Sequence, residues 1–256
     1  MRPARSRRNR ASPPCRLTLP PRSHSDSQRP RIDGTAAIMS LTIRNLAFRY
    51  GGRQILDDFS FDMAAGEQSL LIGASGSGKS TLVNLICGLL SPDAGTISIA
   101  GESMTGIGPS QRDDLRRRRI GLVFQTLKLV SALDLTANLR LAQRLSGHAT
   151  EAERVPMLIE RLGLAHRAHA HPRQLSQGEA QRAAIARALI GRPDLIIADE
   201  PTSALDHANM EKVAALLREC AAEVGASLLI VTHDDRLRDH VASVRHIRAL
   251  SAEAAA

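Results

Sequence analysis

From residue 41 onward, short runs of consecutive apolar residues alternate with longer segments whose apolar positions follow a helical spacing. A strand that is apolar on both faces is typical of a parallel sheet covered by helices on both sides. Strands that alternate with helices along a chain therefore predict an α/β fold with a parallel-sheet core. The runs that we interpret as buried strands are 69–72, 120–124, 195–198 and 227–232.

The segments between these runs predict the helices. We expect one helix over 81–90, directly after a glycine-rich loop, and another near 207–224. Residues from about 131 to 190 have helical patterning with three interruptions, which divide the stretch into several helices because glycine and proline break regular helices. The interruptions are at Gly147, Gly163 and Pro172.

The first patterned segment differs, because its apolar residues alternate with polar ones. The alternation from Leu41 to Tyr50 predicts strands of a small antiparallel β subdomain, and the Gly51-Gly52 pair ends them. Residues 91–95, a Ser-Pro-Asp-Ala-Gly sequence, predict a turn.

Residues 1–38 have little apolar patterning and carry most of the net charge. Nine arginines and two acidic residues contribute +7 of the formal net charge of +8, so that the remainder is nearly neutral and a nucleic-acid partner is not expected. Six prolines and many serines predict a disordered basic leader. It could be an organelle transit peptide, a twin-arginine signal, or the product of a start codon placed ahead of a true start near Met39. We favour the last.

Composition excludes some classes of protein. Aromatic residues make up 2% of the chain, which argues against a single-strand binder built on base stacking. The three cysteines lie far apart and form no CxxC pair, as expected in a reducing compartment. No apolar run reaches the roughly 18–20 residues of a membrane span, so any membrane role requires a partner chain.

The strongest chemical motif lies between the strand at 69–72 and the helix that follows it. It fits the pattern G-x-x-x-x-G-K-[ST], whose backbone N–H groups cradle phosphates. Lys79 can reach the β and γ phosphates of a nucleotide, and the Ser80 hydroxyl can bind Mg²⁺. The motif, which we call the P-loop, consists of Gly73, Ala74, Ser75, Gly76, Ser77, Gly78, Lys79, Ser80 and Thr81.

Two adjacent acids, Asp199 and Glu200, follow the apolar strand at 195–198. The carboxyl ends of parallel strands face the ligand crevice of an open sheet, so Asp199 is expected to hold Mg²⁺ and Glu200 to orient or deprotonate the attacking water. An ordinary turn before Pro201 is the alternative, which the P-loop makes the weaker one.

Six motifs in order along about 39–249 resemble those of ATP-binding cassette (ABC) proteins. They are similar to the family's adenine-stacking aromatic, P-loop, Q-loop, signature, Walker B motif with D-loop, and switch-histidine motif. In this chain they are Tyr50, 73–81, Val123-Phe124-Gln125, Leu175-Ser176-Gln177-Gly178-Glu179, 199–206 and Val231-Thr232-His233-Asp234.

The resemblance implies a P-loop NTPase (RecA-like) core, with an inserted α-helical subdomain at about 126–182, in a single ABC ATPase domain over 39–256. It also implies that two cassettes, identical or different, bind ATP and Mg²⁺ between one P-loop and the partner's signature, and that an integral membrane permease completes the complex. The chain would then be peripheral, on the cytoplasmic face of the membrane. The residues implied as catalytic are Lys79, Gln125, Glu200 and His233; those that bind nucleotide include Tyr50, Ser176, Gly178 and Asp206; those that bind the metal are Ser80, Gln125 and Asp199.

The signature departs from the family pattern at two positions. Gln177 stands where the family usually has Gly, and Glu179 where it commonly has Gln. Because Ser176 and Gly178 are retained, we predict an active ATPase.

Two groups of basic residues are interpreted as structural. The run Arg116–Arg119 is expected at a helix end on a solvated face rather than in a nucleic-acid patch. His166, His169 and His171 have no nearby Cys or acid in the sequence to complete a metal site.

The branch of the family to which the chain is most similar is inferred from weaker sequence features. Residues 120–139, the arginine run and the short ending after His233 resemble the lipoprotein-releasing and macrolide-export branch. A cell-division ABC ATPase is the nearest alternative. Outside transport, a soluble ABC protein of ribosomes or DNA and a P-loop small-molecule kinase are the alternatives, and the single P-loop and the complete motif set argue against them.

Overall fold

The structure, a computed structural model, describes residues 39–203 and 206–247. The predictions made for the leader therefore lie outside the described residues. The predicted motifs lie on or directly after the strands β3 (Gln68–Ile72), β6 (Ile120–Val123), β7 (Leu195–Asp199) and β8 (Ser227–Thr232) and at the start of the helices α1 (Lys79–Ile86) and α5 (Gln177–Leu189). The helix α2 (Pro109–Arg119) ends in the arginine run.

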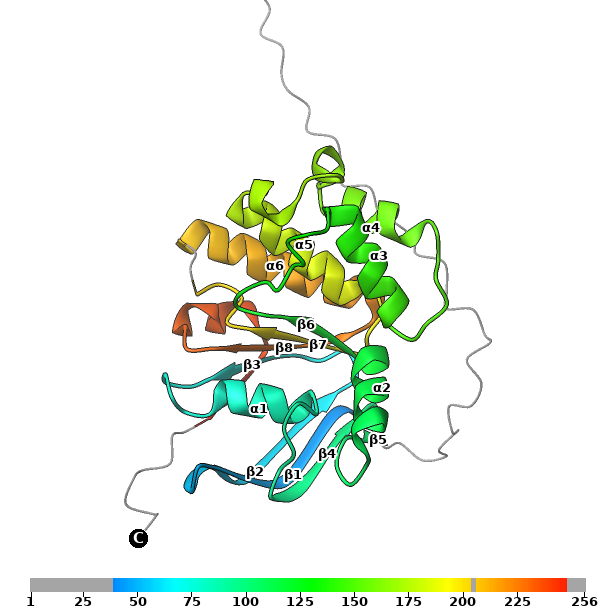
Figure 1. Cartoon of the computed structure of the whole chain (residues 1–256). Helices are drawn as coiled ribbons and strands as arrows, with labels where there is room; N and C mark the ends of the chain where they lie inside the picture. Colours follow the sequence, from blue (N-terminus) through cyan, green and yellow to red (C-terminus); the bar gives the residue numbers. More distant parts are fainter. Residues whose placement is uncertain (1–38, 204–205, 248–256) are drawn as a thin grey trace, which may run out of the picture. The chain divides into compact units, whose positions relative to one another are not determined.

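A five-stranded parallel sheet forms the centre of the fold, in the order β6-β7-β8-β3-β9, with β9 (Ser243–His246) at one edge. Figure 1 shows α5, α6 (His207–Val224), α3 (Leu135–Leu145) and α4 (Arg154–Arg161) on one side of this sheet. The α/β fold with a parallel core is confirmed.

A four-stranded antiparallel sheet lies beyond α1 on the other side (Figure 1). Its strand order is β2-β1-β4-β5, which forms the expected β subdomain. Its strands are β1 (Met39–Tyr50), β2 (Arg53–Ala64), β4 (Ala94–Ile99) and β5 (Glu102–Ser103).

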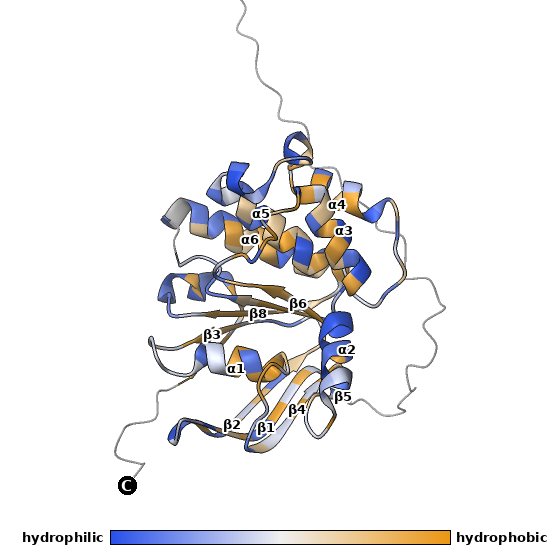
Figure 2. Cartoon of the chain, viewed as in Figure 1, coloured by the Kyte–Doolittle hydropathy of each residue, from blue (hydrophilic) through white to orange (hydrophobic). Residues whose placement is uncertain are grey.

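Two hydrophobic clusters share the parallel sheet, because successive residues of a strand point to opposite faces. In β3, Leu70 and Ile72 pack in the cluster with α5 and α6, whereas Leu71 packs with α1 and the β subdomain. The same alternation continues in β7 and β8. This is why the sequence shows these strands as unbroken apolar runs, and Figure 2 shows the sheet as the hydrophobic middle of the fold.

The helix expected over 81–90 is shorter than predicted. It begins at Lys79 and ends at Ile86, because Gly88 adopts a left-handed φ of 64° and the N–H of Leu89 turns back to the Asn84 carbonyl. Cys87 is buried in the core at this helix end, and burial raises the pKa of its thiol to about 12.

The helical stretch from 131 to 190 divides as the three interruptions predict. It contains α3, α4 and α5, with two short 3₁₀ turns, η1 (Ala165–Arg167) and η2 (Pro172–Gln174), between α4 and α5. The strands β2, β4, β5 and β9 and the last 3₁₀ helix, η3 (Asp235–His240), were not predicted.

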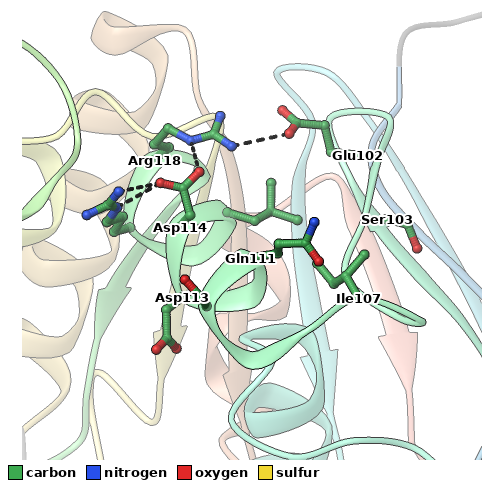
Figure 3. Close-up of a pocket in the computed structure, with 10 residues that line it drawn as sticks. Glu102, Ser103, Ile107, Gln111, Asp113, Asp114 and Arg118 are labelled. Atoms are coloured by element: carbon green, nitrogen blue, oxygen red, sulfur yellow. Dashed lines mark hydrogen bonds and ion pairs between the residues drawn. The ribbon is translucent and has the colours of Figure 1, made fainter.

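The helix α2 is hydrophilic along most of its length, and Leu115 is its buried residue (Figure 2). A cleft of about 720 Å³ lies between α2 and β5. Figure 3 shows Arg118 at its edge, bonded to Asp114 of the same helix and to Glu102 of β5. The arginine run ends a helix and keeps contact with solvent, as expected, and its guanidinium groups also pair with nearby carboxylates.

Candidate nucleotide site

The P-loop connects β3 to α1, as its sequence context predicts. Gly73 has no room for a side chain, since a Cβ would lie 2.5 Å from Ser77 Oγ and 2.7 Å from the Ile247 carbonyl oxygen. Gly78 caps α1 with a φ of 92°, in the left-handed region that favours glycine. The two glycines therefore set the path of the backbone around the place where a phosphate would bind.

Lys79 is the charged residue inside this loop, and its side chain is 7% exposed. Its Nζ donates to the carbonyl oxygens of Gly73 and Ala74, at 2.7 and 2.9 Å, and lies 3.8 Å from Glu200 Oε1. A buried ammonium requires such partners. The same contacts hold the ammonium against the backbone at the start of the loop.

Two buried polar atoms beside the loop have no hydrogen-bond partner among the described residues, Ser77 Oγ and Asp199 Oδ1. Burial raises the pKa of Asp199, the adjacent Glu200 carboxylate adds to this rise, and Lys79 opposes it. A cation that binds Asp199 would favour its ionised form. Hydroxyl and carboxylate oxygens are ligands that Mg²⁺ prefers, so Ser80, which is exposed, and Asp199 fit the expected metal.

Glu200 follows β7 with a backbone φ of 49°, which is uncommon for a residue with a side chain. Its carboxylate is held at both oxygens. Thr232 Oγ1 donates to Oε2 at 2.9 Å, and His233 Nδ1 lies 2.8 Å from Oε1. The carboxylate and the imidazole expected to act in hydrolysis are thus brought together with Lys79.

Gln125 reaches the same region from the segment after β6. Its Nε2 donates to Ser203 Oγ at 3.3 Å, and Ser203 Oγ donates to the Glu200 carbonyl oxygen at 3.2 Å. Gln125 therefore reaches the backbone of Glu200 through Ser203, not the carboxylate itself.

The signature lies at the start of α5. Ser176 caps this helix by accepting from the Glu179 backbone N–H at 3.3 Å, and Glu179 Oε2 accepts from the Ser176 N–H at 2.8 Å. This reciprocal pair is a capping box, for which glutamate and glutamine serve equally. It accounts for Glu179 in a motif that commonly carries glutamine.

The remaining predicted nucleotide residues are not joined to the P-loop by hydrogen bonds that the described part of the chain shows. Tyr50 is 71% exposed at the end of β1. Asp206 caps α6 by accepting from the Asn209 backbone N–H at 2.9 Å. Residues 204 and 205 of the D-loop lie outside the described residues.

The histidine prediction requires a correction, because acids do lie beside two of the three histidines. His166 Nε2 is 3.1 Å from Glu179 Oε1, and His169 Nδ1 is 3.4 Å from Asp134 Oδ2. These acids are distant in sequence and are brought close by the fold. Within residues 39–203 and 206–247, no group of three or more metal-binding side chains is found.

Sequence reasoning assigned no role to Thr232, Ser203 or Gln181. Gln181, buried in α5, donates to the Pro201 carbonyl oxygen at 3.2 Å and so joins the signature helix to the segment after Glu200. The available signal was a hydroxyl residue that follows four apolar residues at the carboxyl end of a strand, which identifies Thr232.

The strand–loop–helix with its enclosed lysine, facing a carboxylate pair and a histidine, defines a P-loop ATPase. The family model described as ABC transporter matches residues 56–203, and the chain belongs to this family. It is an ATP-binding subunit of an ABC transporter and an ABC cassette ATPase.

Curated relatives of similar identity have different names. The uncharacterized ABC transporter ATP-binding protein Rv0986 of Mycobacterium tuberculosis is 39% identical, with 82% of this chain and 87% of that protein covered. The lipoprotein-releasing system ATP-binding protein LolD of Hydrogenovibrio crunogenus is 40% identical, over 72% and 80%. The methionine import ATP-binding protein MetN of Brucella abortus is 39% identical over 77% of this chain, which spans 55% of that protein.

Solved cassettes have the same fold. A dimeric post-hydrolysis state of the cassette MJ0796, bound to ADP and Pi, matches with a TM-score of 0.73 and 30% identity, over 82% of this chain and 97% of that one. The cassette cbiO1 of Clostridium perfringens, part of the complex cbiONQ, matches with a TM-score of 0.74 and 28% identity, over 83% and 87%. In the part of this chain that the structure describes, no helix is both long and apolar enough to span a bilayer.

Proposed function

We propose that this chain hydrolyses Mg-ATP as one of a pair of cassettes and thereby powers a separate membrane permease that exports a lipoprotein or another hydrophobic compound. The observation that carries the hydrolytic part is the contact of Glu200 with His233 and its closeness to Lys79. Glu200 acts as the base or orienting group for water, His233 contacts the γ-phosphate, and Lys79 binds the β and γ phosphates. Tyr50, Ser176, Gly178 and Asp206 complete the nucleotide site across the pair.

The metal is part of the proposal. Mg²⁺ would be held by Ser80, Asp199 and Gln125, and when bound it neutralises phosphate charge. Asp199 supports this assignment through its buried Oδ1, which lacks a protein partner among the described residues.

The similarity to LolD, at 40% identity, supports export, and the similarity to MetN, at 39% identity, supports import. A dimeric relative supports the pairing of cassettes, and a relative that is part of an ABC transporter complex supports a permease partner. The peripheral position of this chain on the cytoplasmic face of the membrane belongs to the same proposal. A cell-division role remains the alternative within the family.

The test combines purification with hydrolysis. We expect the full chain to co-purify with a membrane protein from its own cells, and the complex to hydrolyse Mg-ATP at a rate that Glu200→Gln reduces by about 100-fold or more, as loss of a general base does. Turnover equal to that of the Glu200→Gln variant would contradict the proposal for hydrolysis. The topology of the co-purified permease, together with transport into or out of vesicles, distinguishes export from import.

A further inference from the structure

The hydroxyl of Thr232 is enclosed at the carboxyl end of β8, and the residue has no exposed surface. Two groups contact Oγ1. It donates to Glu200 Oε2 at 2.9 Å and accepts from the Asp234 backbone N–H at 3.1 Å. A buried threonine hydroxyl therefore lies between the catalytic carboxylate and the backbone of the segment that carries His233.

The direction of the bond to Glu200 follows from the inventory of the hydroxyl group. A threonine hydroxyl has one hydrogen to donate. The Asp234 N–H is itself a donor, so it bonds to a lone pair of the threonine oxygen. The hydrogen of the threonine hydroxyl is therefore available for the bond to Glu200. A bond from a neutral donor to an ionised carboxylate is charge-assisted and stronger than an ordinary one.

The backbone of Glu200 is held by the same strand. Its N–H donates to the Val231 carbonyl oxygen at 2.8 Å, and the parallel register places Asp199 beside Val231. With a φ of 49°, Glu200 adopts a conformation that its own backbone does not favour. Strand β8 thus fixes both the backbone and one carboxylate oxygen, while Oε1 remains toward His233 and Lys79.

We propose that Thr232 is a positioning residue for ATP hydrolysis: its hydroxyl binds Glu200 Oε2 and thereby turns Oε1 toward the place of the attacking water. This inference rests on the role proposed for Glu200. Thr232 itself touches neither water nor nucleotide in this scheme. A displacement of about 1 Å in a catalytic group can cost about 100-fold in rate, so a lost anchor is expected to be measurable.

The test compares variants of the full chain by steady-state ATP hydrolysis. Thr232→Val keeps the shape of the side chain and removes the hydroxyl, and we expect kcat to fall about 10- to 100-fold while KM for ATP changes less than about 2-fold. Thr232→Ser restores the donor, and its kcat is expected to stay within about 3-fold of the unmodified chain. Thr232→Ala serves as the second hydroxyl-free variant should the valine variant fail to fold.

Ser227 offers a matched control at the other end of β8. It too is fully buried, and its hydroxyl donates to the Ala64 carbonyl oxygen at 3.1 Å and accepts from the Gly66 N–H at 2.8 Å. Ser227→Ala therefore removes an equivalent pair of buried bonds from the same strand, away from the nucleotide site. We expect it to lower the midpoint of thermal unfolding with kcat unchanged.

A combined variant tests whether Thr232 acts through Glu200. If it does, adding Thr232→Val to Glu200→Gln lowers the residual rate by less than about 2-fold, because effects within one unit are not additive. The inference is overturned if Thr232→Val keeps its kcat, if Thr232→Ser loses as much as Thr232→Val, or if Ser227→Ala lowers kcat to the same degree. Full activity of Glu200→Gln would instead contradict the proposed role of Glu200, so the two failures can be told apart.

Discussion

Glu179 performs two tasks at the start of α5. Its Oε2 completes the capping box, and its Oε1 accepts from Arg167 Nε at 2.9 Å and lies 3.1 Å from His166 Nε2. Bonds from the Ser176 backbone N–H, from Arg167 and from the Ser176 side chain lower the pKa of Glu179 to about 2, and His166 adds to the effect. Glutamine could make the cap but not the ion pairs.

This difference predicts a pH dependence for Glu179→Gln. An unperturbed glutamate has a pKa of 4.5, so between about 4.5 and 2 the unfolded chain binds more protons at this residue than the folded chain. The stability supplied by the carboxylate is complete above that window and is lost as the pH falls through it. We expect the difference in free energy of unfolding between the unmodified chain and Glu179→Gln to be constant from pH 5 to 7 and to shrink below about 4.5, measured by urea unfolding. A difference that grows on acidification would contradict this.

At the scale of elements, α2 is held to its neighbours by the buried side chain of Leu115 and by ion pairs from its last residue. Arg119, its last residue, donates to Glu102 Oε1 on β5 at 2.8 Å and to Asp194 Oδ2, directly before β7, at 2.9 Å. One guanidinium therefore joins the β subdomain to the parallel sheet. Arg117, in contrast, bonds to Asp114 of its own helix.

The two arginines make a matched pair for mutation. We expect Arg119→Leu to lower the free energy of unfolding by about 1 kcal/mol, since the groups are partly exposed, and Arg117→Leu by less than about 0.5 kcal/mol. The cost of Arg119→Leu should diminish in 1 M salt, where charges are screened over about 3 Å. If the two variants lose equal free energy of unfolding, or if salt does not change the loss caused by Arg119→Leu, the ion pairs of Arg119 with Glu102 and Asp194 contribute nothing to stability.

At the scale of the molecule, one parallel sheet supplies a face to each of the two hydrophobic clusters. Every residue of both clusters lies between Leu41 and Ile247. The central strand of the β subdomain is β1, which pairs with β2 and β4. The strands and clusters of the described residues, and the six motifs of the ATPase, all lie from Met39 onward.

From this we expect deletion of residues 1–38 to leave the midpoint of thermal unfolding and the ATPase rate unchanged. Deletion of residues 1–50 is the control, because it also removes β1 and should abolish cooperative unfolding. A large loss of stability or activity from the first deletion would show that the leader has a function.

The sequence was most informative where burial is complete on both faces of a strand, as in β7 and β8, because nothing but a central position explains such apolar runs. It did not predict β2, whose pattern is broken by Asp57 and Asp58 and whose pairing with β1 shifts register. The P-loop could be recognised from local spacing alone. The contacts of Thr232 with Glu200 and of Gln125 with Ser203 depend on which strands become neighbours, and local spacing carries no such information.

The left-handed backbone of Glu200 places stability and activity in competition at a single residue. A conformation of this kind costs about 1–3 kcal/mol for a residue other than glycine. Glycine would relieve this backbone cost, but it would remove the carboxylate proposed to act in hydrolysis and leave the buried Thr232 hydroxyl without its acceptor. The turnover of ATP is therefore maintained at a permanent cost in folding free energy.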